Sequence, residues 1–204
     1  MTPSETSPVA ALKLYALPWH MVQAWSDLRA SYRALMAGAP SESRLLFLAM
    51  LSGLIWFLGQ TIIRAGSPPD PTMTADQRSA EVAAHFVAAL FFRTLMLYGV
   101  AALAQLAMRK AGGTGGWVES RGATFWAALV AAPALAVVEI LAWLVGLPLL
   151  SDIGPVIFAI TLAFCLAEAH GVDNGWKVFG GIVAVSLAVF AFGFGIGALF
   201  GIGG

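Results

Sequence analysis

Charged residues are scarce in this chain of 204 residues. Asp, Glu, Lys and Arg together make up 11% of it, whereas soluble domains carry about 25%. Basic and acidic side chains number eleven each, so the formal net charge is zero. A chain without a surplus of basic residues is poorly suited to a polyanionic partner, and we expect no nucleic acid among its partners.

Cysteine is almost absent as well, because Cys165 is the only one. A single thiol excludes an intramolecular disulfide, and its position in an apolar run indicates an inert, buried side chain. Cys165 and Glu168 share a helical face, but His170 lies off that face and no second cluster of ligands accompanies them. We therefore predict no metal site and no cofactor.

Catalytic motifs are missing too. The glycine cluster at 112–116 lacks the Gly-Lys-Ser/Thr ending of a phosphate-binding loop, and a flexible turn between two helices explains it. Ser52 and Ser186 lack the flanking glycines of a nucleophile elbow, and nothing in the sequence places His85 beside either of them. Paired carboxylates at catalytic spacing are absent. We predict that the protein is not an enzyme; an intramembrane hydrolase using one of these serines is the weaker alternative.

Apolar residues are abundant instead, at 59% of the chain, with a mean hydropathy of +0.83. They fall in five long blocks, at residues 44–63, 81–108, 123–147, 153–169 and 176–202. A helix that crosses about 30 Å of hydrocarbon needs ~20 residues. We predict an all-α membrane protein with five transmembrane helices in a domain from residue 44 to 204. The boundary between the third and fourth helices is the least defined, because residues 147–153 have little polar character.

Residues 1–43 are predicted to form a cytosolic tail and an N-terminal amphipathic interfacial helix. No cleavable signal peptide is expected, because Lys13 and Pro18 interrupt the apolar piece at 9–19. From residue 18 to 36, apolar side chains recur at about 100° per residue, which is typical of a helix lying on a membrane surface. Its expected anchors in the interface are Trp19, Trp25, Arg29 and Arg33. The alternative is a helix packed on a loop of the same protein.

Lysine and arginine are unevenly distributed between the predicted loops, and this bias sets orientation. With the N-terminus inside, only Arg64 and Arg78 lie outside. The inner side then collects Lys13, Arg29, Arg33, Arg44, Arg109, Lys110, Arg121 and Lys177. We predict a cytoplasmic N-terminus and a periplasmic C-terminus, in a bacterial inner membrane, since heavy use of Ala, Gly, Leu and Val suits a bacterium.

Two charged residues, Arg93 and Glu139, fall inside predicted spans. A charge in mid-bilayer costs at least ~2.5 kcal/mol, and both lie roughly 10–16 Å from the outer ends of their spans. Because the two spans are sequential and antiparallel, we predict that the two residues form an intramembrane ion pair or share a polar pocket with Gln60 and His85. Such a pair fixes the register of two helices. The alternatives are a proton or ion relay, or two side chains that reach the interface separately.

Glycines repeat every fourth residue in the last block, at Gly193, Gly197 and Gly201. This spacing places a smooth ridge on one helical face, where another helix can approach closely. Packing within the monomer is one use of such a ridge. Self-association or contact with another membrane protein is the alternative.

The loop Gly112-Gly113-x-Gly115-x-Trp117 runs into Arg121-x-Ala123-x-x-Trp126-Ala127-x-x-x-Ala131-x-Pro133. With a cytosolic N-terminus, five spans and the segment Trp25-Ser26-Asp27-Leu28-Arg29-Ala30, the chain resembles the YIP (Ypt/Rab-interacting protein) family in its bacterial branch. The resemblance implies a five-span fold without catalytic residues and, in eukaryotic members, binding of prenylated small GTPases in vesicle traffic.

The expected function is that of a non-enzymatic scaffold or accessory subunit, acting through helix–helix and cytosolic-face contacts. Its expected partners are the lipid bilayer and other membrane proteins or further copies of itself. A small transporter or channel using Arg93 and Glu139 is the alternative.

Overall fold

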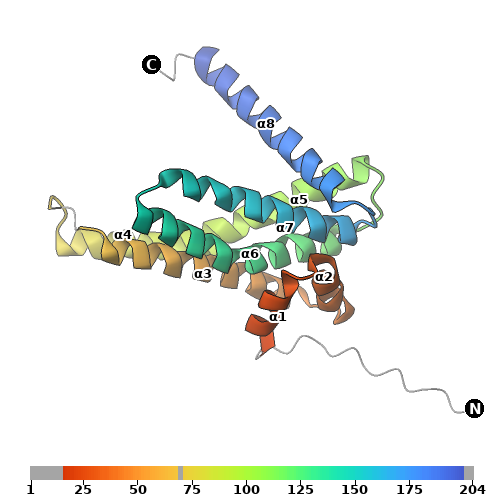
Figure 1. Cartoon of the computed structure of the whole chain (residues 1–204), viewed down its shortest axis with the longest axis horizontal. Helices are drawn as coiled ribbons and strands as arrows, with labels where there is room; N and C mark the ends of the chain where they lie inside the picture. The colour runs from red at the N-terminus through yellow and green to blue at the C-terminus, as the bar shows by residue number, and fades with distance from the viewer. Residues whose placement is uncertain (1–15, 69–70, 200–204) are drawn as a thin grey trace, which may run out of the picture.

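The computed structural model describes residues 16–68 and 71–199, and every regular element within those ranges is helical (Figure 1). The predicted all-α class is therefore confirmed. The elements are α1 (Leu17–Ala24), α2 (Leu28–Ala37), α3 (Glu42–Gly66), α4 (Ala75–Val87), the π-turn η2 (Ala88–Phe92), α5 (Arg93–Lys110), α6 (Trp117–Val145), the 3₁₀ turn η3 (Pro148–Asp152), α7 (Ile153–Ala169) and α8 (Gly175–Leu199).

Four helical segments are long and apolar enough to cross a membrane: Glu42–Gly66, Ala75–Lys110, Trp117–Val145 and Pro148–Ala169. Large apolar side chains on them, such as Phe91, Leu95 and Leu103, are exposed, as they are on helices that face lipid. The second segment joins α4, η2 and α5 into 36 residues, about 54 Å at 1.5 Å per residue. It therefore extends well beyond the predicted span of 81–108.

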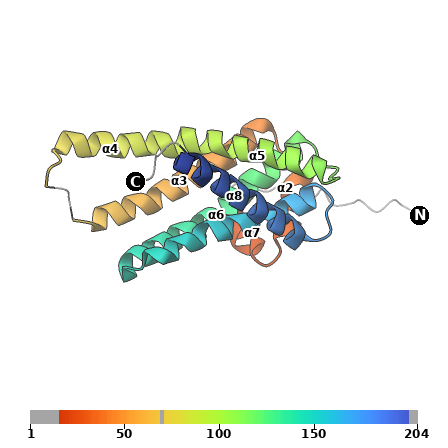
Figure 2. The same ribbon diagram turned by 90° about the horizontal axis from the view of Figure 1, so that it is seen from above.

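The helices run nearly side by side, with their connections at two ends (Figure 1, Figure 2). We call the end that carries α1, α2 and the glycine loop at 111–116 the proximal end. The distal end carries the α3–α4 connection and the turn η3. At the distal end α6 stops at Gly146, whose φ of +69° is left-handed and suits glycine. The third helix therefore ends within two residues of the predicted boundary.

Helix α6 is the centre of the bundle, with α3 and α7 packed along it. Its half nearest the proximal end is buried on all sides, including Phe125, Trp126 and Leu129. The many alanines between them allow neighbouring helices to come close. Trp126 Nε1 donates a hydrogen bond to Ser31 Oγ of α2 over 3.0 Å, so the indole N–H has a partner inside the core.

The predicted single helix at 18–36 is instead two helices, and the prediction was wrong in this respect. Asp27 breaks it, because its side chain accepts a hydrogen bond from Ala30 N over 2.9 Å and caps the start of α2. Tyr32 and Leu35 of α2 are buried against the bundle. The segment is thus packed on the same protein, while Trp19 and Trp25 remain 63% and 46% exposed.

Helix α8 projects away from the other helices (Figure 1). It packs on α7 near its start, where the rings of Trp176 and Phe164 meet edge to face at 5.4 Å. Its side chains from 183 to 188 are all exposed. Of the predicted glycine ridge, Gly193 and Gly197 lie within α8 and Gly201 lies outside the described residues. The fifth span stays a prediction.

Candidate functional site

One face of α3 carries polar and aromatic side chains toward α4. Trp56, Gln60 and Arg64 are spaced by four residues, so they line a single face of the helix. Opposite them, α4 presents Glu81 and His85. Together with Arg93 at the start of α5, these side chains follow the α3–α4 contact from the distal end to the middle of the membrane helices. We call this set of six residues the polar column.

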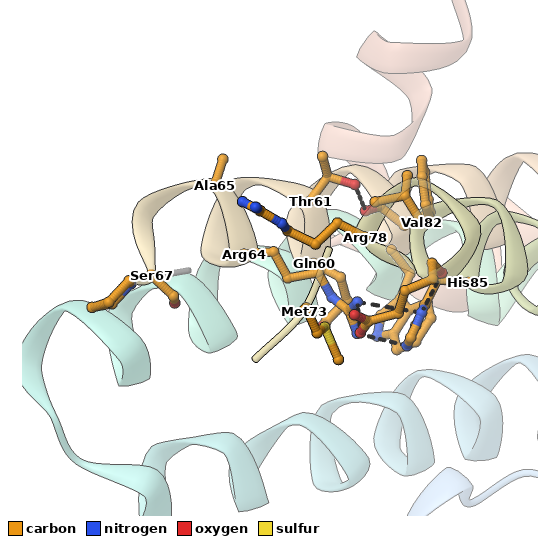
Figure 3. A pocket seen from close by; sticks show the side chains of 13 residues that line it. Gln60, Thr61, Arg64, Ala65, Ser67, Met73, Arg78, Val82 and His85 are labelled. Carbon is orange, nitrogen blue, oxygen red and sulfur yellow. Dashed lines mark hydrogen bonds and ion pairs between the residues drawn. The ribbon is translucent and has the colours of Figure 1, made fainter. Parts of the chain in front are cut away.

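The distal part of the polar column is a closed cycle of hydrogen bonds (Figure 3). Arg64 Nη1 donates to Glu81 Oε1 over 2.7 Å, and Arg64 Nη2 lies 2.6 Å from His85 Nε2. His85 Nδ1 lies 2.9 Å from the carbonyl oxygen of Glu81. Arg64 Nη1 also lies 3.3 Å from His85 Nδ1, so the guanidinium approaches both ring nitrogens.

A cavity of about 540 Å³ opens beside this cycle, within the range of small-molecule sites. Trp56, Phe57, Met73 and Val82 give it apolar walls, and Arg64, Arg78, Glu81 and His85 give it charged or polar ones. Figure 3 shows the Arg78 side chain reaching from α4 toward α3. The cavity is therefore apolar along its sides and polar where the two helices diverge.

The predicted direct contact between Arg93 and Glu139 is not among the ion pairs of the described residues. Gln60 of α3 donates a hydrogen bond to the Glu139 carboxylate instead. Arg93 lies over the ring of Trp56, at 5.2 Å from its centroid. The two residues thus contact different side chains of α3, although Glu139 still attracts Arg93 electrostatically. The alternative of a polar pocket shared with Gln60 therefore holds for Glu139.

Arg93 is the least satisfied charged group of the polar column. Its Nε is buried without a hydrogen-bond partner, while its guanidinium lies over the Trp56 ring and is attracted electrostatically by Glu139. Cation–π contacts contribute about 0.5–2 kcal/mol, which is less than the ~2.5 kcal/mol or more that a charge costs in mid-bilayer. Trp56 lines the cavity and also contacts the Arg93 guanidinium, so the same side chain touches both the cavity and the buried charge.

The π-turn η2 directs Arg93 toward α3. The Arg93 N–H bonds to the carbonyl of Ala88, five residues earlier, so the turn holds one residue more than an α-helical turn. One extra residue rotates everything beyond it by about 100°, which brings Arg93 onto the face of Glu81 and His85. Sequence spacing gave no signal of this turn, because the eight-residue interval from His85 to Arg93 equals the one from Trp56 to Arg64 on the regular helix α3.

A second polar cluster lies at the proximal end, on three different helices. His170 is 1% exposed, and its Nε2 lies 2.8 Å from Ser120 Oγ. Ser120 Oγ donates to Gln105 Oε1 over 2.6 Å, and Gln105 Nε2 donates to the carbonyl of Gly115 over 3.0 Å. Burial lowers the pKa of His170, against a smaller opposing effect of Glu119. Sequence patterns gave no signal for Gln105 or Ser120, because no local spacing connects them.

The hydrogen bond between Ser120 and His170 has the opposite direction to the one that a general base would make with a catalytic serine. Ser120 donates its proton to Gln105, so His170 Nε2 must carry a proton and donate it to Ser120. A general base would have to accept the serine proton. Ser120 is also fully buried, as is Ser52, whose hydroxyl donates to the Ala49 carbonyl over 2.7 Å. These hydroxyl groups therefore stabilise the fold in the arrangement described.

The glycine loop connects two helices, as predicted, and it is held against His170. Thr114 N donates to the carbonyl of His170 over 3.2 Å. A Cβ on Gly113 would lie 2.9 Å from His170 Cβ, and one on Gly115 would overlap the carbonyl of Ala169. Glycine is required at both positions because the backbone of the loop approaches the end of α7 this closely.

Arg29 and Arg33, predicted as membrane anchors, both bind Glu168 at the end of α7. Arg29 Nε lies 2.8 Å from Glu168 Oε2, and Arg33 Nη1 lies 2.9 Å from Oε1. Arg29 also donates to the carbonyls of Val172 and Asp173, over 3.1 Å and 2.6 Å. The guanidinium groups thus hold α2 against the α7–α8 loop. For Trp19 and Trp25 the predicted anchoring is untested.

Among the described residues no three His, Cys, Asp or Glu side chains gather closely enough to hold a metal ion. Cys165 is buried in α7. Compared with known proteins, the chain matches no family model, no curated protein and no solved structure. The resemblance to the YIP family therefore stays a prediction.

Proposed function

We propose that the protein is a small membrane transporter or channel that uses the polar column between α3 and the α4–α5 helix. The observation that carries this proposal is Arg93. It lies midway along a helical segment of 36 residues, with a buried, unpartnered Nε. A charged residue at such a depth is a functional candidate by default, since structure alone seldom retains it.

The arrangement of the polar column supports the passage of a solute along it better than it supports a purely structural role. The Arg64 cycle lies at the distal end beside the cavity. Trp56, two helical turns before Arg64 on α3, lines the same cavity and contacts the Arg93 guanidinium. π-turns occur frequently at functional sites, and here one sets the direction of Arg93. Trp56 is suited to gate the step from the cavity to Arg93.

Glu139 provides the sharpest test, because Gln at this position can still accept a hydrogen bond from Gln60. Purified protein is placed in liposomes, and charge movement under salt and pH gradients is recorded with a potential-sensitive dye. We expect Glu139→Gln to lower the flux and Arg93→Leu to abolish it, with thermal stability unchanged. Arg109→Leu, at the exposed proximal end of α5, serves as the control and should transport normally.

The opposite pattern would reject the proposal. If Glu139→Gln lowers thermal stability, and the joint replacement Arg93→Leu with Glu139→Leu restores it, the two charges serve the fold. Wild-type liposomes that move no charge under any gradient would also count against passage.

A second candidate function, a scaffold or accessory subunit of the YIP type, is favoured by α8. This helix leaves the bundle, and its side chains from 183 to 188 are exposed. A fifth span with the ridge Gly193, Gly197 and Gly201 would suit another helix, from a partner or from a second copy. Affinity purification in mild detergent tests it, and repeated recovery of a lone monomer would reject it.

For either function we propose that the proximal end faces the cytoplasm of a bacterial inner membrane and that the C-terminus is periplasmic. The distribution of lysine and arginine supports this orientation. The exposed indoles of Trp19, Trp25, Trp117 and Trp176 lie at the proximal end and suit a membrane interface there, on either side of the membrane.

A further inference from the structure

Among the described residues, the charges that line the distal cavity leave a surplus of one positive charge. In that part of the chain Arg64 and Arg78 line the cavity together with one carboxylate, Glu81, which is engaged by Arg64. Arg78 makes no hydrogen bond or ion pair within residues 16–68 and 71–199, and it is exposed. Its guanidinium has five donors in a planar fork, which match a carboxylate or a phosphate. The cavity is therefore electrostatically suited to a monoanion.

The remaining walls favour an apolar body on that anion. Trp56 and Phe57 of α3 line the cavity two helical turns away from Arg64, and Val82 of α4 lines it beside Glu81. Apolar walls with a few convergent polar groups are typical of sites that orient a small amphiphile. A free inorganic anion would leave these walls without contact, and a cation would meet the guanidinium groups of Arg64 and Arg78.

We propose that the cavity between α3 and α4 binds an amphiphilic organic monoanion, a carboxylate or phosphate ester with an apolar chain. The anionic head lies between Arg78 and Arg64, and the chain lies along Trp56 and Phe57. The proposal names the substrate class of the transport function proposed above and rests on it, although binding is measurable independently of transport.

The cycle of Arg64, Glu81 and His85 limits which anions fit. Glu81 already neutralises one guanidinium, so a head of charge minus one is balanced and a head of higher charge is repelled by the carboxylate. His85 Nε2 lies 2.6 Å from Arg64 Nη2, which keeps the guanidinium of Arg64 directed across the cavity. Beyond the head, Arg93 behind Trp56 is a second cation that a bound anion meets on its way inward.

The experiment is isothermal titration of the full chain in nanodiscs of zwitterionic lipid. Decanoate and decyl methyl phosphate, a diester of charge minus one, are the probes, acetate is the head without a chain, and decyltrimethylammonium is the chain with the opposite charge. We expect both anionic amphiphiles to bind in competition with each other and the other two to bind at least tenfold more weakly. Equal binding of the anionic and cationic amphiphiles would overturn the proposal.

Arg78→Ala is the diagnostic variant, because Arg78 is exposed and without a partner in the described residues, so the fold does not depend on it. Its affinity for decanoate should fall about tenfold or more, while its thermal unfolding is unchanged. Arg109→Ala, a cation at the other end of the bundle, should bind as the wild type does. Val82→Trp fills the cavity and should abolish binding; unchanged binding in Arg78→Ala and Val82→Trp would overturn the site.

A third measurement distinguishes two sources of the natural anion, a lipid of the bilayer and a soluble amphiphile. Adding phosphatidylglycerol to the nanodiscs weakens decanoate binding if the natural ligand is a lipid of the bilayer, and leaves it unchanged if the ligand is a soluble amphiphile. If decanoate binding depends on Arg78 but the liposomes show no charge movement, the transport function is rejected and the proposed binding site is still supported. If the liposomes show charge movement but the anionic amphiphiles do not bind, the proposed substrate class is rejected and the transport function is still supported.

Discussion

Gly53 of α3 lies directly against the carbonyl oxygen of Ala89 in the π-turn. A Cβ on Gly53 would overlap that oxygen and would also lie 3.7 Å from Arg93 Cδ. Ala89 is itself buried, at 1% exposure. The close approach of α3 to η2 therefore depends on the absence of a side chain at residue 53, and the same approach sets the contact between Arg93 and Trp56.

Replacing Gly53 by Leu should destabilise the protein, because either α3 or the π-turn must move. Overpacking of this kind costs typically about 1–3 kcal/mol. Thermal unfolding in detergent measures the effect, and the proposed transport should be lost together with it. Gly99→Ala is the matched control in the same bundle, since nothing lies within 4 Å of a Cβ there. It should be neutral or stabilising by up to about 1 kcal/mol; equal destabilisation by both would contradict the close contact.

The two arginines on Glu168 should differ in their contribution. The Arg29 side chain is 28% exposed and makes three charged hydrogen bonds, so its removal should cost about 1.5–3 kcal/mol. The Arg33 side chain is 60% exposed, and its ion pair should contribute about 0.2–1 kcal/mol. Alanine variants of each, measured by thermal unfolding, give the order. A double-mutant cycle with Glu168→Gln should find coupling for both pairs, and Arg33→Ala costing more than Arg29→Ala would contradict the geometry.

The membrane helices could be predicted from the sequence because hydropathy is a local property. About twenty apolar residues in a row predict a span wherever the rest of the chain lies, and the ends at Gly146 and Ala169 agree with the predicted ones to within two residues. The length of the α4–η2–α5 segment was missed, since Thr74 and Gln77 form a capping box well before the apolar run begins. That signal is also local, and its spacing is that of a helix start.

Contacts between helices could not be predicted in this way. Gln105, Ser120 and His170 come from three helices, and Glu168 meets Arg29 across most of the chain. The predicted depths of Arg93 and Glu139 stay predictions, and depth does not determine rotation about the helix axis. The π-turn changed that rotation by one residue, and Arg93 contacts Trp56 while Glu139 accepts from Gln60. The polar column therefore depended on a backbone irregularity without a clear sequence signal.

The stability of the proximal cluster should depend on pH through His170. Burial lowers the pKa of this imidazole below its ordinary value of 6.5, so the unfolded chain binds a proton more readily than the folded one. Stability is then fully present above pH 6.5 and is lost as the pH falls through the window between 6.5 and the lowered pKa. Thermal unfolding between pH 8 and pH 5 measures this loss.

His170→Gln is the variant that isolates the effect. A glutamine amide can still donate to Ser120 and does not titrate, so the loss of stability at acid pH should become smaller. His20 of α1, which is half-buried and lies outside the cluster of Gln105, Ser120 and His170, provides the control as His20→Gln. Identical profiles for the wild type and His170→Gln would show that His170 does not titrate in this window.

The orientation of the bundle can be tested with single cysteines, because the natural one is inert. Cys165 is 0% exposed, so the wild type should not react with a membrane-impermeant maleimide, and Cys165→Ala provides a clean background. In that background Met73→Cys reports on the distal end and Ala111→Cys on the proximal end, and both positions are exposed. In intact cells stripped of their outer membrane, Met73→Cys should react at once and Ala111→Cys only after the membrane is permeabilised. The reverse pattern would place the glycine loop outside, contradict the charge bias, and move the cavity of the polar column to the cytoplasmic side.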